Sequence, residues 1–167
     1  MLINYRQLKL SDAEKIRIWR NKKIKILKQN KIIKKKDQIK YFKDLILSKK
    51  SKMKLFAIEL NQKLIGYGGI VNISYYFKTA EVSFLINNKI NYNSLSYEKI
   101  FSNFLIFIKK YSKKRKLRRL YTETFSFRKK HIKILEHCGF KLEGVMKKHV
   151  IKNQKIYDSL IHGILNK

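Results

Sequence analysis

The sequence predicts an α/β (α+β) fold with about seven strands and four helices, in the order βααβββαβαββ. Three observations support this prediction. Strand-like runs alternate with segments whose apolar residues recur at helical spacing. No glycine- or serine-rich linker and no internal repeat interrupts the chain. A length of 167 residues suits a single hydrophobic core, so we expect one domain over residues 1–167.

The N-terminal part is predicted to contain one strand and two helices. Residues 5–10 are strand-like, and Ser11 with Glu14 has the spacing of a capping box that starts the first helix. Asp37 is predicted to open the second helix. The apolar faces of these helices consist of Ala13, Ile16 and Trp19 and of Ile39, Phe42 and Ile46.

The middle of the chain is predicted to form an antiparallel meander followed by a long helix and another strand. The meander strands are expected at residues 55–60, 63–74 and 79–87. Ser94 or Ser96 caps the helix, and residues 117–124 form the strand that follows it. The buried face of the helix consists of Ile100, Phe101, Phe104, Leu105 and Ile108.

The C-terminal part is predicted to be a helix followed by a hairpin. The helix spans residues 131–137 and ends at Gly139, which suits the left-handed residue that often terminates helices. Residues 141–152 and 156–165 then form two strands joined by a turn. Ile132, Leu135 and Cys138 recur at helical spacing and mark the buried stripe of the helix.

The formal charge of +30 raises the question of a nucleic-acid ligand. Basic residues concentrate in residues 22–36 and 109–119, but lysine is abundant along the whole chain together with Ile and Asn. Proteins that bind nucleic acid also need a docking element, such as a recognition helix or a stacking platform, and none can be recognised in the sequence. Nucleic acid is therefore not expected as the main ligand, whereas anionic small molecules suit a basic surface.

Composition also bears on location and metal binding. No apolar run reaches membrane-spanning length and the N-terminus has no signal-like segment, so we expect a cytoplasmic protein. Cys138 is the single cysteine, which excludes an internal disulfide and a cysteine-rich metal site. We expect Cys138 to be a small core residue and expect no metal.

The C-terminal sequence contains two motifs, Leu-Glu-x-Cys-Gly-Phe-x-x-Glu-Gly and, further along the hairpin, Lys-Asn-x-x-x-Tyr-Asp. In these motifs it resembles GNAT-type N-acetyltransferases of the Rim-like branch. The element order agrees with that family over nearly the full length. The resemblance implies a single GNAT domain with a mixed central sheet. It also implies acetyl-CoA as the co-substrate, a small amine as the acceptor, and a monomer or homodimer.

Carried over residue by residue, the resemblance implies a cofactor site along the fourth strand and at the start of the next helix. The helix start offers unpaired amides that suit a pyrophosphate. Serine replaces both glycines of the family's phosphate-binding signature, and the place of the family's usual asparagine is taken by Arg128. The cofactor-binding residues are expected to be Phe84, Leu85, Ile86, Asn91, Tyr92, Asn93, Ser94, Leu95, Ser96, Arg128 and His131.

For catalysis, the resemblance places a base at Glu81, at the head of the fourth strand. The alternative is that Glu81 is a solvated partner of a lysine. Many family members carry a tyrosine at the position of Leu135 that protonates the departing thiolate, a role closed to leucine. His131, at a helix start, is expected to be a surface residue rather than a catalyst.

The acceptor is indicated by Trp19-Arg20-Asn21, which resembles a signature of GNAT enzymes acting on nucleotide-linked amino sugars, such as the pseudaminic-acid-pathway N-acetyltransferase. Tyr67, followed by Gly68 and Gly69, is expected to make room for the acceptor. The resemblance thus implies a UDP-linked 4-amino-deoxysugar. The alternatives are a ribosomal-protein N-terminal acetyltransferase, a basic nucleic-acid-binding protein and a catalytically silent GNAT fold.

Overall fold

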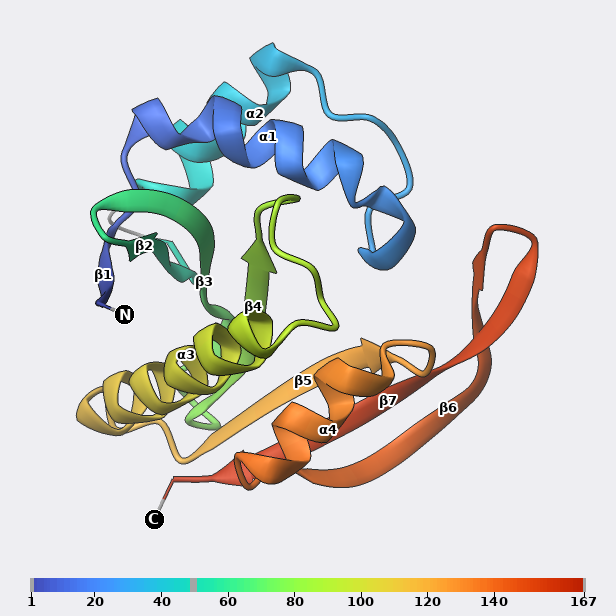
Figure 1. Ribbon diagram of the computed structural model, residues 1–167. Coiled ribbons are helices and arrows are strands. Elements are labelled where there is room, and N and C mark those ends of the chain that lie inside the picture. The colour runs from blue at the N-terminus through green and yellow to red at the C-terminus, as the bar shows by residue number, and fades with distance from the viewer. Residues whose placement is uncertain (1, 49–50, 167) are drawn as a thin grey trace. The chain divides into compact units, whose positions relative to one another are not determined.

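The computed structural model describes residues 2–48 and 51–166 (Figure 1). Seven strands form one sheet in the order β1-β2-β3-β4-β5-β7-β6. The strands are β1 (Ile3–Gln7), β2 (Lys54–Leu60), β3 (Lys63–Ser74), β4 (Thr79–Ile86), β5 (Arg119–Phe125), β6 (Lys141–Lys152) and β7 (Lys155–Leu165). The α-helices are α1 (Ala13–Lys22), α2 (Lys35–Tyr41), α3 (Leu95–Lys114) and α4 (Lys129–His137). The predicted element order is confirmed.

The sheet is mixed. The pairs β1–β2, β2–β3, β5–β7 and β6–β7 are antiparallel, whereas β4 and β5 are parallel. A crossover that contains α3 joins β4 to β5, which is the connection that a parallel pair requires.

The start of α1 differs from the prediction. The predicted capping box of Ser11 and Glu14 is not formed, so this prediction is wrong: a short 3-10 turn, Leu10–Asp12, precedes the helix. The carboxylate of Asp12 instead accepts the amide of Lys9 at 2.9 Å. A short acidic side chain at this position therefore organises the turn.

By their internal contacts, the residues form two compact units, and β4 runs through both. The first unit comprises the described residues within Met1–Asn72 and Ser83–Lys89. Trp19, Tyr41 and Ile46 pack against its core without being fully buried. That core consists of Leu8, Ala13, Ile16, Phe42, Leu55, Ala57, Tyr67 and Leu85.

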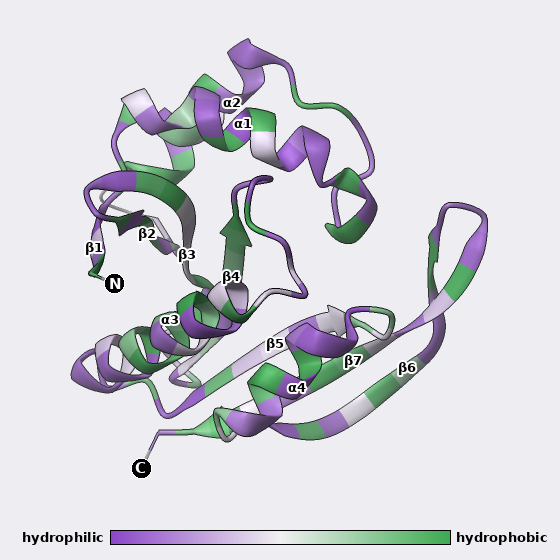
Figure 2. Ribbon diagram, viewed as in Figure 1, coloured by the Kyte–Doolittle hydropathy of each residue, from purple (hydrophilic) through white to green (hydrophobic). Residues whose placement is uncertain are grey.

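The second unit comprises Ile73–Val82 and the described residues within Ile90–Lys167. The face of α3 predicted to be buried is confirmed, since each of its five residues is at most 1% exposed. On α4, Ile132 and Leu135 are buried and Cys138 is half-buried. In Figure 2, which colours the ribbon by hydropathy, these helices carry both hydrophobic and hydrophilic residues, as expected of helices with one buried face.

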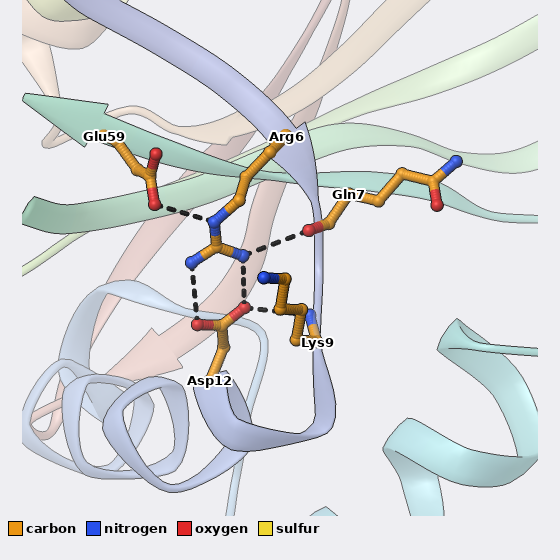
Figure 3. A network of polar contacts seen from close by, with 5 residues as sticks. All are labelled: Arg6, Gln7, Lys9, Asp12 and Glu59. Atoms are coloured by element: carbon orange, nitrogen blue, oxygen red, sulfur yellow. Dashed lines mark hydrogen bonds and ion pairs between the residues drawn. The ribbon is translucent and has the colours of Figure 1, made fainter. Parts of the chain in front are cut away.

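An ion-pair network ties the first strand to the start of α1 in the first unit (Figure 3). Arg6 donates two hydrogen bonds to Asp12, at 2.7 and 3.0 Å, and one to Glu59 of β2 at 2.7 Å. Burial opposes ionisation of Asp12, but its hydrogen bonds from Arg6 and Lys9 lower the pKa of the carboxyl below its usual value. Asp12 is only 5% exposed, so its charge depends on Arg6.

We predict that Arg6→Met lowers the free energy of unfolding by about 2–4 kcal/mol, because Asp12 stays buried without its cation. Urea denaturation measures this change. The control is Arg17→Met, which removes an arginine that pairs with Glu14 on one helix and donates to the main-chain oxygen of Ile33. The carboxylate of Glu14 is far more exposed than that of Asp12, so the loss in this variant should be smaller. Equal losses in the two variants would show that the Arg6 network is not a structural anchor.

Candidate active site

Strand β4 carries both the expected base and the expected binding segment for the cofactor arm. Its parallel ladder with β5 covers only Thr79–Glu81 paired with Arg119–Tyr121. Glu81 is half-buried at the end of this ladder. The side chains of Leu85 and Ile86 are buried, at 3% and 0% exposed, so this segment offers a ligand its main chain rather than its side chains.

Lys23 fixes the end of β4 within the first unit. Its ammonium group donates to the main-chain oxygens of Ile86 at 2.7 Å and Asn87 at 2.9 Å. Lys23 is only 8% exposed, which is rare for a lysine. Sequence reasoning missed this residue because nothing distinguishes it from the many lysines around it.

Two glycines of β3 permit close approach of neighbouring strands. A Cβ at Gly66 would lie 2.6 Å from the carbonyl oxygen of Leu85, so glycine is needed to bring β3 against β4. A Cβ at Gly69 would lie 2.0 Å from the carbonyl oxygen of Lys54. The space beside Gly69 is therefore filled by β2, and the expectation that this glycine makes room for the acceptor is wrong.

The start of α3 is a capped turn in the second unit. Of the two predicted caps, Ser94 is the correct one, since its hydroxyl accepts the amide of Tyr97 at 3.1 Å. The same hydroxyl donates to the Asn91 oxygen at 2.6 Å, so it is committed to the turn. The first hydrogen bond of the helix is donated by the amide of Glu98 to the main-chain oxygen of Ser94. The amides of Leu95 and Ser96 therefore have no acceptor within the helix.

A buried aromatic cluster joins the starts of α3 and α4. The hydroxyl of Tyr97 lies 2.6 Å from Nδ1 of His131, and the imidazole stacks on Phe101 with centroids 4.1 Å apart. Arg128 lies 3.3 Å from the same nitrogen and its guanidinium covers the ring of Tyr92 at 5.6 Å. His131 is 7% exposed, so the expectation of a surface histidine is wrong.

The protonation state of this cluster follows from its donors. The guanidinium of Arg128 can only donate, so Nδ1 of His131 is an acceptor and the imidazole is neutral. Burial, Arg128 and His162 hold the pKa of His131 well below its usual value. Burial also raises the pKa of Tyr97 and of Tyr92, so both phenols stay protonated.

A groove of about 520 Å³ lies beside this cluster, between the first turns of α3 and the exposed face of α4. Lys130 contacts Glu98 at 3.1 Å and the main-chain oxygen of Asn93 at 3.3 Å. Within residues 2–48 and 51–166, Lys129 and Lys133 form no ion pair, so they give the groove a net positive charge. The remaining lining consists of Ser102, Ile134 and His137.

The expected acceptor residues lie together in the first unit. Trp19 packs against its core. Asn21 bonds the amide and the carbonyl of Ile33, each at 2.9 Å, so its side chain holds the segment after α1 in place. The half-buried Arg20 interacts with the buried hydroxyl of Tyr67, whose pKa is raised by burial. Arg20 and Tyr67 are thus brought together.

The family follows from a comparison over most of the chain. Residues 5–161 match the family described as acetyltransferase (GNAT) domain. The chain belongs to the GNAT acetyltransferase family. It is an acetyl-CoA-dependent N-acetyltransferase with a single GNAT domain. No curated protein sequence matches the chain.

Solved structures of low identity share the fold. Spermidine N-acetyltransferase from Vibrio cholerae, in complex with CoA and spermine, superposes with a TM-score of 0.85 at 18% identity, covering 98% of this GNAT chain and 95% of that chain. The dodecameric structure of the same enzyme in an intermediate state gives 0.81 at 20% identity, covering 98% and 94%. Among the described residues, no helix is long and apolar enough to cross a membrane.

We predict that His131 makes the stability of the chain fall below neutral pH. An unfolded histidine titrates near pH 6.5, whereas the folded pKa of His131 is lower, so the unfolded state binds the extra proton first. The contribution is complete above about pH 7 and declines by up to about 1.4 kcal/mol per pH unit as pH falls from 6.5 toward the folded pKa.

Urea denaturation of wild type and His131→Gln between about pH 5 and 8 measures this contribution. The variant is expected to show a shallower decline than wild type. His137→Gln, at an exposed position on the same helix, is the control and should keep the wild-type slope. An unchanged slope in His131→Gln would mean that the histidine is not held neutral.

Proposed function

We propose that this GNAT enzyme is of the Rim-like branch and acetylates an amino group on an anionic acceptor, a UDP-linked 4-amino-deoxysugar used in cell-surface glycan synthesis. The observation that carries the proposal is that Trp19 packs against the core that contains Tyr67 while Arg20 interacts with the Tyr67 hydroxyl, so these three residues, which the sequence resemblance assigns to a nucleotide-linked sugar, share one region of the first unit. An arginine fork suits a phosphate of the acceptor, and Tyr67 supplies a hydroxyl.

We place the phosphates of acetyl-CoA at the groove beside α3 and α4. The site fits them in two respects. The amides of Leu95 and Ser96 open a long helix, where a partial positive charge favours phosphate. Lys129 and Lys133 add two cations that no carboxylate of the described chain neutralises. Ser94, one of the two serines that replace the family glycines, does not close this route, because its hydroxyl is bonded within the turn that caps the helix.

Acetyl-CoA supplies the activated acetyl group. In our proposal Glu81 accepts a proton from the acceptor's ammonium group, directly or through water, and the freed nitrogen lone pair attacks the thioester carbonyl carbon. The main-chain amides of β4 stabilise the resulting oxyanion. The carbon–sulfur bond then breaks, the thiolate leaves with the electron pair, and the nitrogen gives up its second proton to the thiolate or to water, which leaves a neutral amide. Leu135, buried at 1% exposed, takes no part in protonating it.

A polyamine is the second candidate acceptor, because the structural neighbours are spermidine N-acetyltransferases. The charge of this chain argues against it. A polycation needs carboxylates, yet three of those in the first unit are already paired with arginines: Asp12, Glu14 and Glu59. The formal charge of +30 also repels a cation and attracts a nucleotide sugar.

We predict that a UDP-linked 4-amino-deoxysugar is acetylated at least tenfold more efficiently, in kcat/KM, than spermidine or peptides from ribosomal-protein N-termini. Thiol release from acetyl-CoA measures each rate. Arg20→Lys keeps the charge but not the planar fork and should raise KM for the sugar while sparing KM for acetyl-CoA. Faster turnover of spermidine or of the peptides would reject the amino sugar.

We predict that Glu81→Gln lowers kcat at least tenfold at neutral pH and leaves acetyl-CoA affinity nearly unchanged. A positioned base contributes about 10²–10⁴-fold, and glutamine keeps the shape but cannot accept the proton. The deficit should shrink toward pH 9, where more of the amine is already deprotonated. Glu136→Gln, at an exposed carboxylate of α4, is the control. Wild-type rates in Glu81→Gln from pH 7 to 9 would remove Glu81 from the mechanism.

A further inference from the structure

Two turns that are distant in sequence meet in the second unit. The main-chain amides of Arg118 and Arg119 both donate to the oxygen of Lys78, at 2.7 and 3.2 Å. This contact joins the turn between β3 and β4 to the turn between α3 and β5 (Figure 1). Both turns lie at the C-terminal end of α3. Because α3 has 20 residues, this end is about 30 Å from the capped start that borders the acetyl-CoA groove.

The first of these turns exposes three consecutive aromatic side chains. Tyr75, Tyr76 and Phe77 are 62%, 88% and 65% exposed. The rings of Tyr76 and Phe77 meet edge to face, 4.8 Å apart, and the Phe77 amide is held by the hydroxyl of Ser74 at 3.2 Å. In the part of the chain that the structure describes, no other aromatic side chain is as exposed. A cluster of this kind marks a binding surface rather than a scattered surface residue.

The second turn brings further cations to the turn that carries these rings, through the amides of Arg118 and Arg119 on the oxygen of Lys78. No Asp or Glu occurs in residues 60–80 or 99–122, so the basic side chains there have no local counter-charge. Arg119 alone is neutralised, by Glu143 at 2.6 Å. Six further cations, in the two turns and at the end of α3, are exposed and form no ion pair with any described residue: Lys78, Lys113, Lys114, Arg115, Lys116 and Arg118. Together with the three aromatic residues they form what we term the basic aromatic patch.

We propose that the basic aromatic patch binds single-stranded nucleic acid, independently of acetyl transfer. Exposed rings stack with unpaired bases of any sequence, and lysine and arginine side chains contact the phosphates. The bases of a duplex are already stacked on one another, so a single strand fits better than a double strand. The turn contains two tyrosines and no aliphatic residue, which favours stacking over insertion into a lipid surface.

A basic surface alone would not indicate this ligand, since lysine is spread over the whole chain. The three exposed rings beside the cations do indicate it. Their proximity could not be predicted from the sequence, because β4 and α3 separate the aromatic run from the cation run.

Fluorescence anisotropy with a labelled oligouridylate of about 12 nucleotides tests the patch. Wild type is expected to bind with an affinity that falls steeply between about 50 and 200 mM salt. Tyr76→Ser with Phe77→Ser should weaken binding at least tenfold. Lys114→Ser, Lys116→Ser and Arg118→Ser together should weaken it and reduce the salt slope by about two, since each phosphate contact on a single strand contributes about 0.7.

The matched control is Lys31→Ser, Lys34→Ser and Lys36→Ser, which removes the same charge from exposed positions of the first unit. It should retain most of the binding. All three variants should keep wild-type acetyl transfer, which verifies their folding. Equal weakening in the control and the patch variants would overturn the proposal in favour of a net-charge effect. So would unchanged binding in the aromatic variant, or sedimentation with phosphatidylglycerol vesicles without oligonucleotide binding.

Discussion

The hydrogen bond between the hydroxyl of Tyr97 and Nδ1 of His131 is the interaction on which the candidate cofactor site depends. It fixes the first turn of α3 against the first turn of α4, and stacking of the imidazole on Phe101 holds the contact inside the core. Because a neutral imidazole is the acceptor, this contact adds no second positive charge beside Arg128. The cations of the groove, Lys129 and Lys133, stand on the outer face of the helix that this contact positions.

A second constraint acts on β4. The ladder between β4 and β5 ends at Glu81. The later part of β4 is held within the first unit by the ammonium group of Lys23 and by its close approach to Gly66. These contacts fix the end of the strand through its own main-chain oxygens. A strand that is anchored in this way keeps its main chain ready for a ligand, which suits the cofactor site that the sequence resemblance implies along β4.

The element order could be predicted because each segment has a clear apolar period, and the five buried positions of α3 all follow from it. The start of α1 could not, because Asp12 takes its role from Arg6, six residues earlier and on a strand. Burial of His131 depends on Tyr97 and Phe101, which lie in a different helix. Lys23 and Gly69 depend on strands elsewhere in the chain. Local patterns predict elements well, but a role set by a distant partner leaves no local signal.

The central claim is that the groove at the starts of α3 and α4 holds the phosphates of acetyl-CoA. Calorimetric titration of CoA and 3′-dephospho-CoA tests it with Lys129→Ser/Lys133→Ser and, as a matched control, Lys141→Ser/Lys147→Ser on exposed positions of β6. The account predicts that the groove variant binds CoA at least about tenfold more weakly, since charge-assisted hydrogen bonds to phosphate are lost, while the control binds as wild type does. Equal CoA affinity in wild type and the groove variant would contradict the account.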